Sequence, residues 1–479
     1  MIDKKCAFLL FICLALILDG VSIAQANSGG GSAYGYSADP WDTQALVPEQ
    51  GRYNANRTNL PVAPSATPPI PGMIARLRSL PALTAWALQH NPQTAAAWAS
   101  LRAAAAALGV AKGAWLPTSS VIVNDQRSGT TYDIGISPPP VNGVYNSLTL
   151  SETLFHFGYR RATVDQARAN VLASRFDANA ALQSIALNVA VDYYDMAQAR
   201  EEVHIYRQGV AEAHEIYADA EAQYRVHLKS ATDVYQAQME LAQAQEQLHS
   251  AQGQAAAQRG ILAEAAGLPV TTPLSVYPLP VPRDTVPASI HALLRTTLRK
   301  NPTLLAEQAR VRAASAAVRQ AASADSPSLS LNAGLGKNVL SNQPDESSFS
   351  IGLKLNIPLD LSYSAAYQMQ QNRALMQEAQ AQVRVTANAV QLSVWENYAR
   401  WRGAVRAYKA ARQQVASARK AVDGIRTEYR IGLASMLDLV TAEQNLISAR
   451  IVLVEVMNEV AVDRAQLYRN VGFNPIPSR

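Results

Sequence analysis

The stretch Phe349-Ser-Ile-Gly-Leu-Lys-Leu-Asn-Ile357 alternates strictly between apolar and polar residues. Period-two alternation is typical of a β-strand whose two faces meet different solvents. A long segment with helical periodicity follows this stretch, and no hairpin partner lies close behind it. The two edges of the predicted strand therefore need partners from elsewhere in the chain or from another chain.

The first 26 residues have the order of a secretory signal peptide. Lys4 and Lys5 precede an apolar run at 7–18, and Ala24-Gln-Ala26 provides a cleavage site before Asn27. Both cysteines lie in this segment, so the mature chain would have no disulfide and no thiolate metal site. No block of like charges supports nucleic-acid binding, and no later run of about 18 apolar residues predicts a transmembrane helix. If the protein lies in a membrane, β-strands are expected to cross it.

The chain repeats itself. Asn91-Pro92 recurs as Asn301-Pro302, and the segment Tyr224-Arg-Val-His-Leu-Lys-Ser230 is echoed by Tyr429-Arg-Ile-Gly-Leu-Ala-Ser435. The number of residues that separates the two copies differs slightly between these two segments, and the difference falls in one loop between strands. This is the pattern of a tandem duplication. Each half therefore predicts a helix, two strands joined by a loop, a very long helix, a turn and a second long helix.

This pattern gives the expected boundaries. We expect a signal peptide at 1–26, an extended arm at 27–80, a first repeat at 81–270, a linker at 271–287, a second repeat at 288–473 and a tail at 474–479. Strands are expected at about 117–126, 144–155, 328–337 and 348–358, and long helices at about 158–226, 231–267, 360–430 and 435–472. The fold class is mostly α, with four strands per chain and a first long helix of about 100 Å.

The four strands have the length that crosses an outer membrane, about nine to eleven residues, with apolar side chains toward lipid. The expected lipid-facing residues are Leu148, Leu150, Leu154, Leu329, Leu331, Phe349, Ile351, Leu353, Leu355 and Ile357. An open sheet edge is not tolerated in lipid, and the smallest barrels have about eight strands. Four strands cannot close alone, so we expect an oligomer.

The chain resembles the TolC family of outer-membrane factors from about Leu83 to Phe473. The motifs that carry the resemblance are Ile357-Pro-Leu359, the turn Tyr429–Ser435 with Asp438-Leu439, and Ala442-Glu-Gln-Asn-Leu446, in an order that is duplicated. The resemblance implies a homotrimer with a twelve-stranded barrel, a helical tunnel through the periplasm, and docking to a periplasmic adaptor and an inner-membrane transporter.

The resemblance also implies a gate at the helical turns. The matching residues are Tyr429, Asp233, Asp438 and Thr232, and we expect a hydrogen bond from Tyr429 to Asp233 between neighbouring hairpins. Symmetry would place the aspartates in a negative ring that favours cations. Two positions depart from the family pattern, because Ala434 replaces a gating arginine and Thr441 replaces a second aspartate. The simpler alternative for Asp233 and Asp438 is helix N-capping.

The turns themselves are expected to dock the adaptor. The residues concerned are Arg225, Val226, Leu228, Ser230, Arg430, Ile431, Gly432, Leu433 and Ser435. The two turns differ at one position that matters to the backbone, because Gly432 adopts a left-handed conformation without cost and His227 does not.

No catalytic motif is complete, because His214-Glu215 lacks the second histidine of a zinc-protease helix and Gly334-Leu-Gly-Lys337 lacks the first glycine of a phosphate loop. We expect no enzyme activity, cofactor or metal. The leading hypothesis is an outer-membrane exit channel for small-molecule efflux. The alternatives are the channel of a type I protein secretion system and a periplasmic coiled-coil scaffold without a pore.

Overall fold

The computed structural model of the protein describes residues 75–130, 135, 139–282, 289–341, 344–359 and 362–473. The chain divides into two units, Met1–Thr58 and Asn59–Arg479, and every described residue belongs to the second. The expected signal peptide, most of the expected arm and the tail at 474–479 therefore lie outside the described residues.

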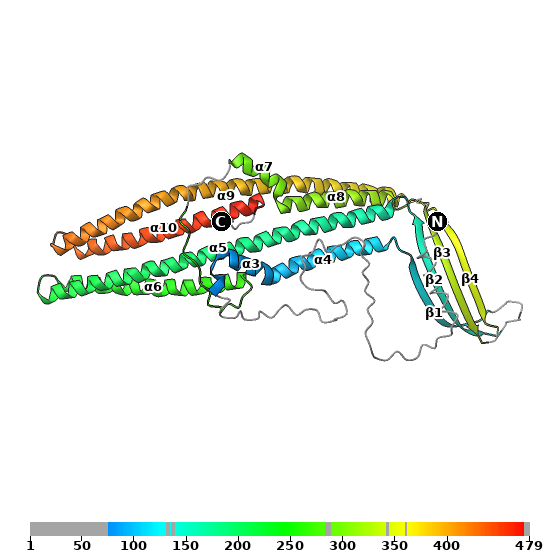
Figure 1. Ribbon diagram of the computed structural model, residues 1–479, viewed down its shortest axis with the longest axis horizontal. Helices are drawn as coiled ribbons and strands as arrows, with labels where there is room; N and C mark the ends of the chain where they lie inside the picture. The colour runs from blue at the N-terminus through cyan, green and yellow to red at the C-terminus, as the bar shows by residue number, and fades with distance from the viewer. Residues whose placement is uncertain are drawn as a thin grey trace. The chain divides into compact units, whose positions relative to one another are not determined.

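The two halves of the described chain contain the same elements in the same order (Figure 1). After a 3-10 turn, Ala75–Arg78, the first half contains α3 (Leu80–His90), α4 (Pro92–Gly113), β1 (Thr118–Ser128), β2 (Val141–Phe155), α5 (Tyr159–Arg225) and α6 (Ala231–Ala265). The second half contains α7 (Ile290–Lys300), α8 (Pro302–Ala322), β3 (Ser328–Leu340), β4 (Glu346–Asn356), α9 (Ser364–Arg430) and α10 (Met436–Val471). Helices α5 and α9 have 67 residues each, so both are about 100 Å long.

The long helices pack as paired hairpins. Helix α5 packs along α6, and α9 packs along α10, while α5 also contacts α4, α8 and α10 (Figure 1). By length and composition alone, α4 would pass as a membrane span, but its Leu101 and Leu108 pack with Val164 of α5. Small alanine side chains make up much of these contacts, and they let neighbouring helices approach closely along their whole length.

The recurring Asn-Pro pair ties each hairpin to the next helix. Asn91 caps α4 by accepting a hydrogen bond from Gln93 N at 2.8 Å, and its amide donates to Ala265 O at the end of α6, at 2.9 Å. Asn301 does the same in the second half, where its amide donates to Asn470 O of α10 at 2.9 Å. Both asparagines are buried, and the N–H group and the oxygen of each side-chain amide are paired, as burial of an amide requires.

The four strands form one antiparallel sheet in the order β1-β2-β3-β4. The central pair joins the two repeats, because β2 comes from the first half and β3 from the second. Within the described residues, β1 and β4 are the edge strands, and every residue of both is exposed. The sheet therefore presents two open edges.

One face of the sheet is mainly apolar, with Glu152 opposite Leu331 as a charged residue on the same face. The register places Leu148 opposite Leu335 and Leu335 opposite Phe349, and residues directly opposite one another share a face. The same face carries Val121, Leu150, Leu329, Leu331, Ala333, Ile351, Leu353 and Leu355. Two expected positions differ, because Leu154 lies in a β-bulge where Phe155 takes the place opposite Leu329, and Ile357 follows the end of β4.

All four connections between strands and helices lie at one end of the sheet. Thr118 at the start of β1 lies opposite Ser151 near the end of β2, and Ser328 at the start of β3 lies opposite Asn356 at the end of β4. The ends of α4 and α8 and the beginnings of α5 and α9 therefore meet this one sheet end.

Candidate functional site

The two helical turns have the same backbone design. The N–H of Leu228 donates to Gln223 O at 2.9 Å, and the N–H of Leu433 donates to Glu428 O at 2.8 Å. Each pattern closes a helix C-terminus around one left-handed residue. That residue is Gly432 in the second turn, with φ 81°, and His227 in the first, with φ 62°. The first turn therefore adopts the left-handed conformation that the sequence disfavours, and it bears the steric cost.

Both returning helices begin with a capping box. The side chain of Ser230 accepts from Asp233 N at 3.3 Å, and the Asp233 carboxylate accepts from Ser230 N at 3.3 Å. Ser435 and Asp438 repeat this arrangement, with the carboxylate also accepting from Ser435 Oγ at 2.6 Å. The aspartates therefore take part in N-capping as the simpler alternative expected, with serine as the N-cap residue and aspartate at the third helical position accepting from the serine backbone N–H.

Asp438 nevertheless keeps its charge accessible. Its side chain is fully exposed, and the two hydrogen bonds from Ser435 lower the pKa of its carboxyl below the usual range. Thr232, beside Asp233, is exposed as well. A carboxylate that is both anchored by a cap and open to solvent is suited to line a narrow opening, because capping does not neutralise it.

Tyr429 is buried between the two hairpins and not at the surface. Its ring is 3% exposed and packs against Ile216 of α5 and Met436 and Leu439 of α10. The ammonium of Lys229, from the other turn, lies 4.1 Å from the ring centroid, which is a cation–π contact. Burial, followed by the nearby Asp233 and Asp219 carboxylates, raises the pKa of Tyr429 to about 12.

The expected hydrogen bond from Tyr429 to Asp233 is not formed within the described chain. The hydroxyl of Tyr429 has no hydrogen-bond partner there, and the Asp233 carboxylate is engaged by its own helix terminus. The two turns are instead held together by the Lys229–Tyr429 contact and by an ion pair of 4.0 Å between Arg430 and Asp219. Both contacts join the first hairpin to the second.

A buried ionic contact above the turns was not anticipated from the sequence. Glu443 of α10 has a side chain 5% exposed and accepts from Arg426 of α9 at 2.5 Å. Burial raises the pKa of Glu443, and Arg426 opposes that shift. Glu240 of α6, also buried, accepts from Gln444 at 2.8 Å. The sequence does indicate that Glu443 is buried, because it follows Leu439 by four residues and precedes Leu446 by three and so lies on the apolar stripe of the helix.

The turn residues expected to dock an adaptor are all exposed. Their apolar members are largely open to solvent, with Val226 at 62%, Leu228 at 74%, Ile431 at 66% and Leu433 at 77% exposed. Four large apolar side chains at the tips of two adjacent hairpins are unusual on a surface that meets only water.

The apolar face of the sheet is the second exposed feature. On β4, Phe349 is 84% exposed, Ile351 70%, Leu353 66% and Leu355 61%. Their transfer from water to an apolar environment is favourable by roughly 25 cal/mol per Å² of surface. In the part of the chain that the structure describes, no group of three or more His, Cys, Asp or Glu residues has metal-site geometry.

Comparison with known proteins agrees with this arrangement. The family model described as "Outer membrane efflux protein" matches residues 83–268 and 293–472, one segment per repeat. Protein CyaE of Bordetella pertussis is 29% identical over 395 residues, which cover 81% of this chain and 83% of CyaE. Outer membrane efflux protein BepC of Brucella suis is 24% identical over 328 residues, 68% of this chain and 71% of BepC.

Solved structures share the fold. The CmeC outer membrane channel of Campylobacter jejuni superposes with a TM-score of 0.74 at 19% identity, covering 83% of this chain and 87% of CmeC. The outer membrane protein VceC of Vibrio cholerae gives a TM-score of 0.72 at 21% identity, covering 82% of this chain and 96% of VceC.

Proposed function

Because the chain belongs to the outer membrane efflux protein family, we propose that it is the outer-membrane exit channel of a tripartite export system. The strands cross the outer membrane, and the long helices extend through the periplasm. The observation that carries the proposal is a four-stranded sheet with an apolar exposed face and two open edges. Energy for export comes from an inner-membrane transporter, because an open conduit supplies none.

The proposed assembly is a homotrimer. Unpaired backbone groups at the edges of β1 and β4 cannot be left in hydrocarbon, so β4 of one copy pairs with β1 of the next. Three sheets of four strands close a barrel of twelve. The helices also leave apolar side chains exposed, since Leu392 and Trp395 of α9 are 56% and 55% exposed and Val110 of α4 is 78% exposed, and neighbouring copies would cover them.

A matched pair on β4 tests the membrane-spanning role. Ile351→Lys places a charge on the apolar face, and Ser350→Lys places the same charge on the opposite face. We expect a penalty of about 2–4 kcal/mol for Ile351→Lys if the site lies near the bilayer centre. Heat-modifiable trimers in the outer-membrane fraction should disappear for Ile351→Lys and persist for Ser350→Lys. Equal trimer yield from both variants would rule out a lipid-facing β4.

The proposed gate is the pair of turns, with Asp233 and Asp438 of three copies forming an anionic ring. Asp438→Asn removes the charge and keeps an oxygen that caps the helix. In planar bilayers, we expect the variant to select less strongly for cations, while Asp423→Asn, an exposed site on α9, leaves selectivity unchanged. If Asp438→Asn channels keep the wild-type reversal potential, the ring is not part of the conduction path.

The exposed apolar turn residues are the proposed adaptor surface. Leu228→Ser combined with Leu433→Ser should abolish cross-linking to the adaptor and export in cells, because both lost side chains are more than 70% exposed. Conductance of the purified double variant should remain that of the wild type, which separates docking from pore formation. Normal export by a variant with both substitutions would remove the turns from the docking surface.

The proposed cargo is small toxic molecules, which the name of the efflux relative BepC favours. Deletion of the gene followed by two readouts decides between this cargo and a secreted polypeptide. Hypersensitivity to toxic compounds with an unchanged set of secreted proteins is expected, and loss of one secreted protein alone would assign the channel to type I secretion.

A further inference from the structure

The helical turns nearest the sheet carry an excess of positive charge. We define the basic collar as the three turns of each helix that adjoin the strands, residues 103–113, 159–169, 312–322 and 364–374. It holds seven basic residues and one acidic residue. Arg160, Arg161, Arg168, Arg312 and Arg319 come from α5 and α8, and α4 and α9 supply one each. The connections to the strands add Asp325 and Asp360, which still leaves the region four charges positive.

The excess is not shared by every helix. Helix α6, the returning helix of the first hairpin, does not reach the strands, and it has four acidic residues and one basic residue. The full chain has a net charge of only +5 over 479 residues. Helix α9 is also basic beyond the collar, with ten basic and four acidic residues at 375–430. What distinguishes the collar is that its basic residues adjoin the sheet and that arginines of α5 and α8 line one cleft there.

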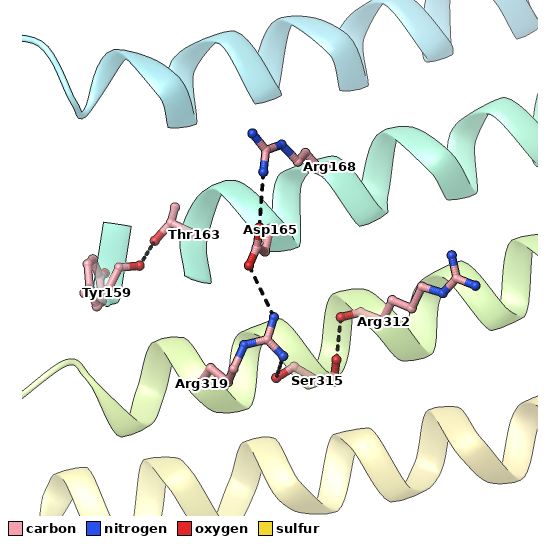
Figure 2. Close-up of polar contacts among 7 residues, drawn as sticks. All are labelled: Tyr159, Thr163, Asp165, Arg168, Arg312, Ser315 and Arg319. Atoms are coloured by element: carbon pink, nitrogen blue, oxygen red, sulfur yellow. Dashed lines mark hydrogen bonds and ion pairs between the residues drawn. The ribbon is translucent and has the colours of Figure 1, made fainter. Parts of the chain in front are cut away.

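Within the collar, α5 and α8 form an arginine-lined cleft of about 360 Å³. Figure 2 shows Asp165 of α5 between two guanidinium groups, at 3.3 Å from Arg168 and 3.5 Å from Arg319. One carboxylate cannot neutralise two arginines. The third arginine, Arg312, is exposed, and its guanidinium has no partner among the described residues (Figure 2). Leu172 and Ala169 add an apolar wall.

The same junction has the aromatic residues that favour a membrane interface. Trp115, Phe155 and Phe157 are each about half exposed, and the guanidinium of Arg160 lies 4.4 Å from the centroid of the Trp115 ring. Indole and phenyl rings concentrate at the level of lipid headgroups. The collar adjoins these rings along the chain, because Trp115 and Phe157 lie in the connections between the helices and the strands and Phe155 ends β2.

We propose that the basic collar binds the headgroups of anionic phospholipids in the periplasmic leaflet, with the α5–α8 cleft as one phosphate site. Guanidinium groups bind phosphate oxygens through paired, charge-assisted hydrogen bonds, and the apolar wall accepts the glycerol end of the lipid. This inference rests on the proposed channel only in requiring that the strands span the bilayer. It adds a lipid preference that the channel function does not need.

The test measures lipid preference of the intact trimer. Full-length trimer that conducts in planar bilayers is equilibrated in detergent with equal amounts of phosphatidylglycerol and phosphatidylcholine, and the retained lipids are counted by mass spectrometry. We expect the wild type to retain phosphatidylglycerol, less so at high salt. Combined Arg168→Gln, Arg312→Gln and Arg319→Gln should reduce the preference by about fivefold per arginine, or about hundredfold in all.

Two further variants keep the outcome clear. Asp165→Asn frees two arginines and should increase the preference, a gain that misfolding cannot imitate. Combined Arg384→Gln, Arg406→Gln and Arg419→Gln removes the same charge from exposed positions of α9 outside the collar and should change nothing. A conducting wild-type trimer without lipid preference would overturn the proposal and leave the channel intact. So would a collar variant that alters ion selectivity but not lipid retention, because its arginines would then face the lumen.

Discussion

Asp192 of α5 is a position where one substitution should stabilise the protein in a pH-dependent way. The side chain lies near the middle of α5, partly buried and close to two more carboxylates. Burial, followed by Asp195 and then Glu264, raises the pKa of Asp192 to about 6 from an ordinary 3.8. At neutral pH the folded state therefore holds a charge that its surroundings disfavour.

The sign of the effect follows from the direction of the shift. A carboxyl with a raised pKa binds its proton more tightly in the folded state, so its contribution to stability is complete below pH 3.8 and is lost as pH rises through about 6. A shift of about two units corresponds to about 3 kcal/mol at most. Because the group keeps contact with solvent, we reduce this to about 1–2 kcal/mol.

Asp192→Asn removes the charge and keeps the shape. Above pH 7, we expect it to raise the free energy of local opening around 186–200 by about 1–2 kcal/mol, and near pH 3.5 the two proteins should be equal. Hydrogen–deuterium exchange of peptides from this part of α5, corrected for intrinsic rates, should be about 5–30-fold slower in the variant at pH 8.

The control is Asp423→Asn, an exposed site on α9, where exchange should not change. Equal protection of wild type and Asp192→Asn at pH 8, or a difference that persists at pH 3.5, would refute the electrostatic reasoning.

Three further substitutions have clear expected outcomes. His227→Gly should stabilise the first turn by about 0.5 kcal/mol, seen as slower exchange there, because glycine accepts a φ of 62° without steric cost. Gly472→Ala should lower the yield of folded, protease-resistant protein, since a Cβ would lie 2.6 Å from Lys300 O at a φ of 91°. Lys229→Met should weaken the contact between the turns by about 1 kcal/mol, and Lys229→Arg should retain it, as judged by exchange of the peptide that contains Tyr429.

The elements that the sequence predicts are those with a local periodic pattern. The strand at 349–357 was evident because alternation repeats every two residues, and the helix at Tyr159–Arg225 was evident because good helix formers run without proline over its length. The duplicated turn located both hairpin tips to within a few residues. Each of these signals is contained in a short stretch of chain, so no knowledge of spatial neighbours is required.

The tertiary structure decided whatever depends on neighbours that are distant in sequence. Tyr429 was expected to donate to Asp233, but packing against α5 and α10 buries its hydroxyl and brings Lys229 onto its ring. Periodicity places Glu443 on the apolar stripe of α10, but it does not identify Arg426, on α9, as the partner. The bulge at Leu154 and the placing of β2 beside β3 likewise arise from pairing between repeats. The sequence determines which face of each element is apolar, because periodicity is local, whereas only the assembled fold determines which charges and rings meet across those faces.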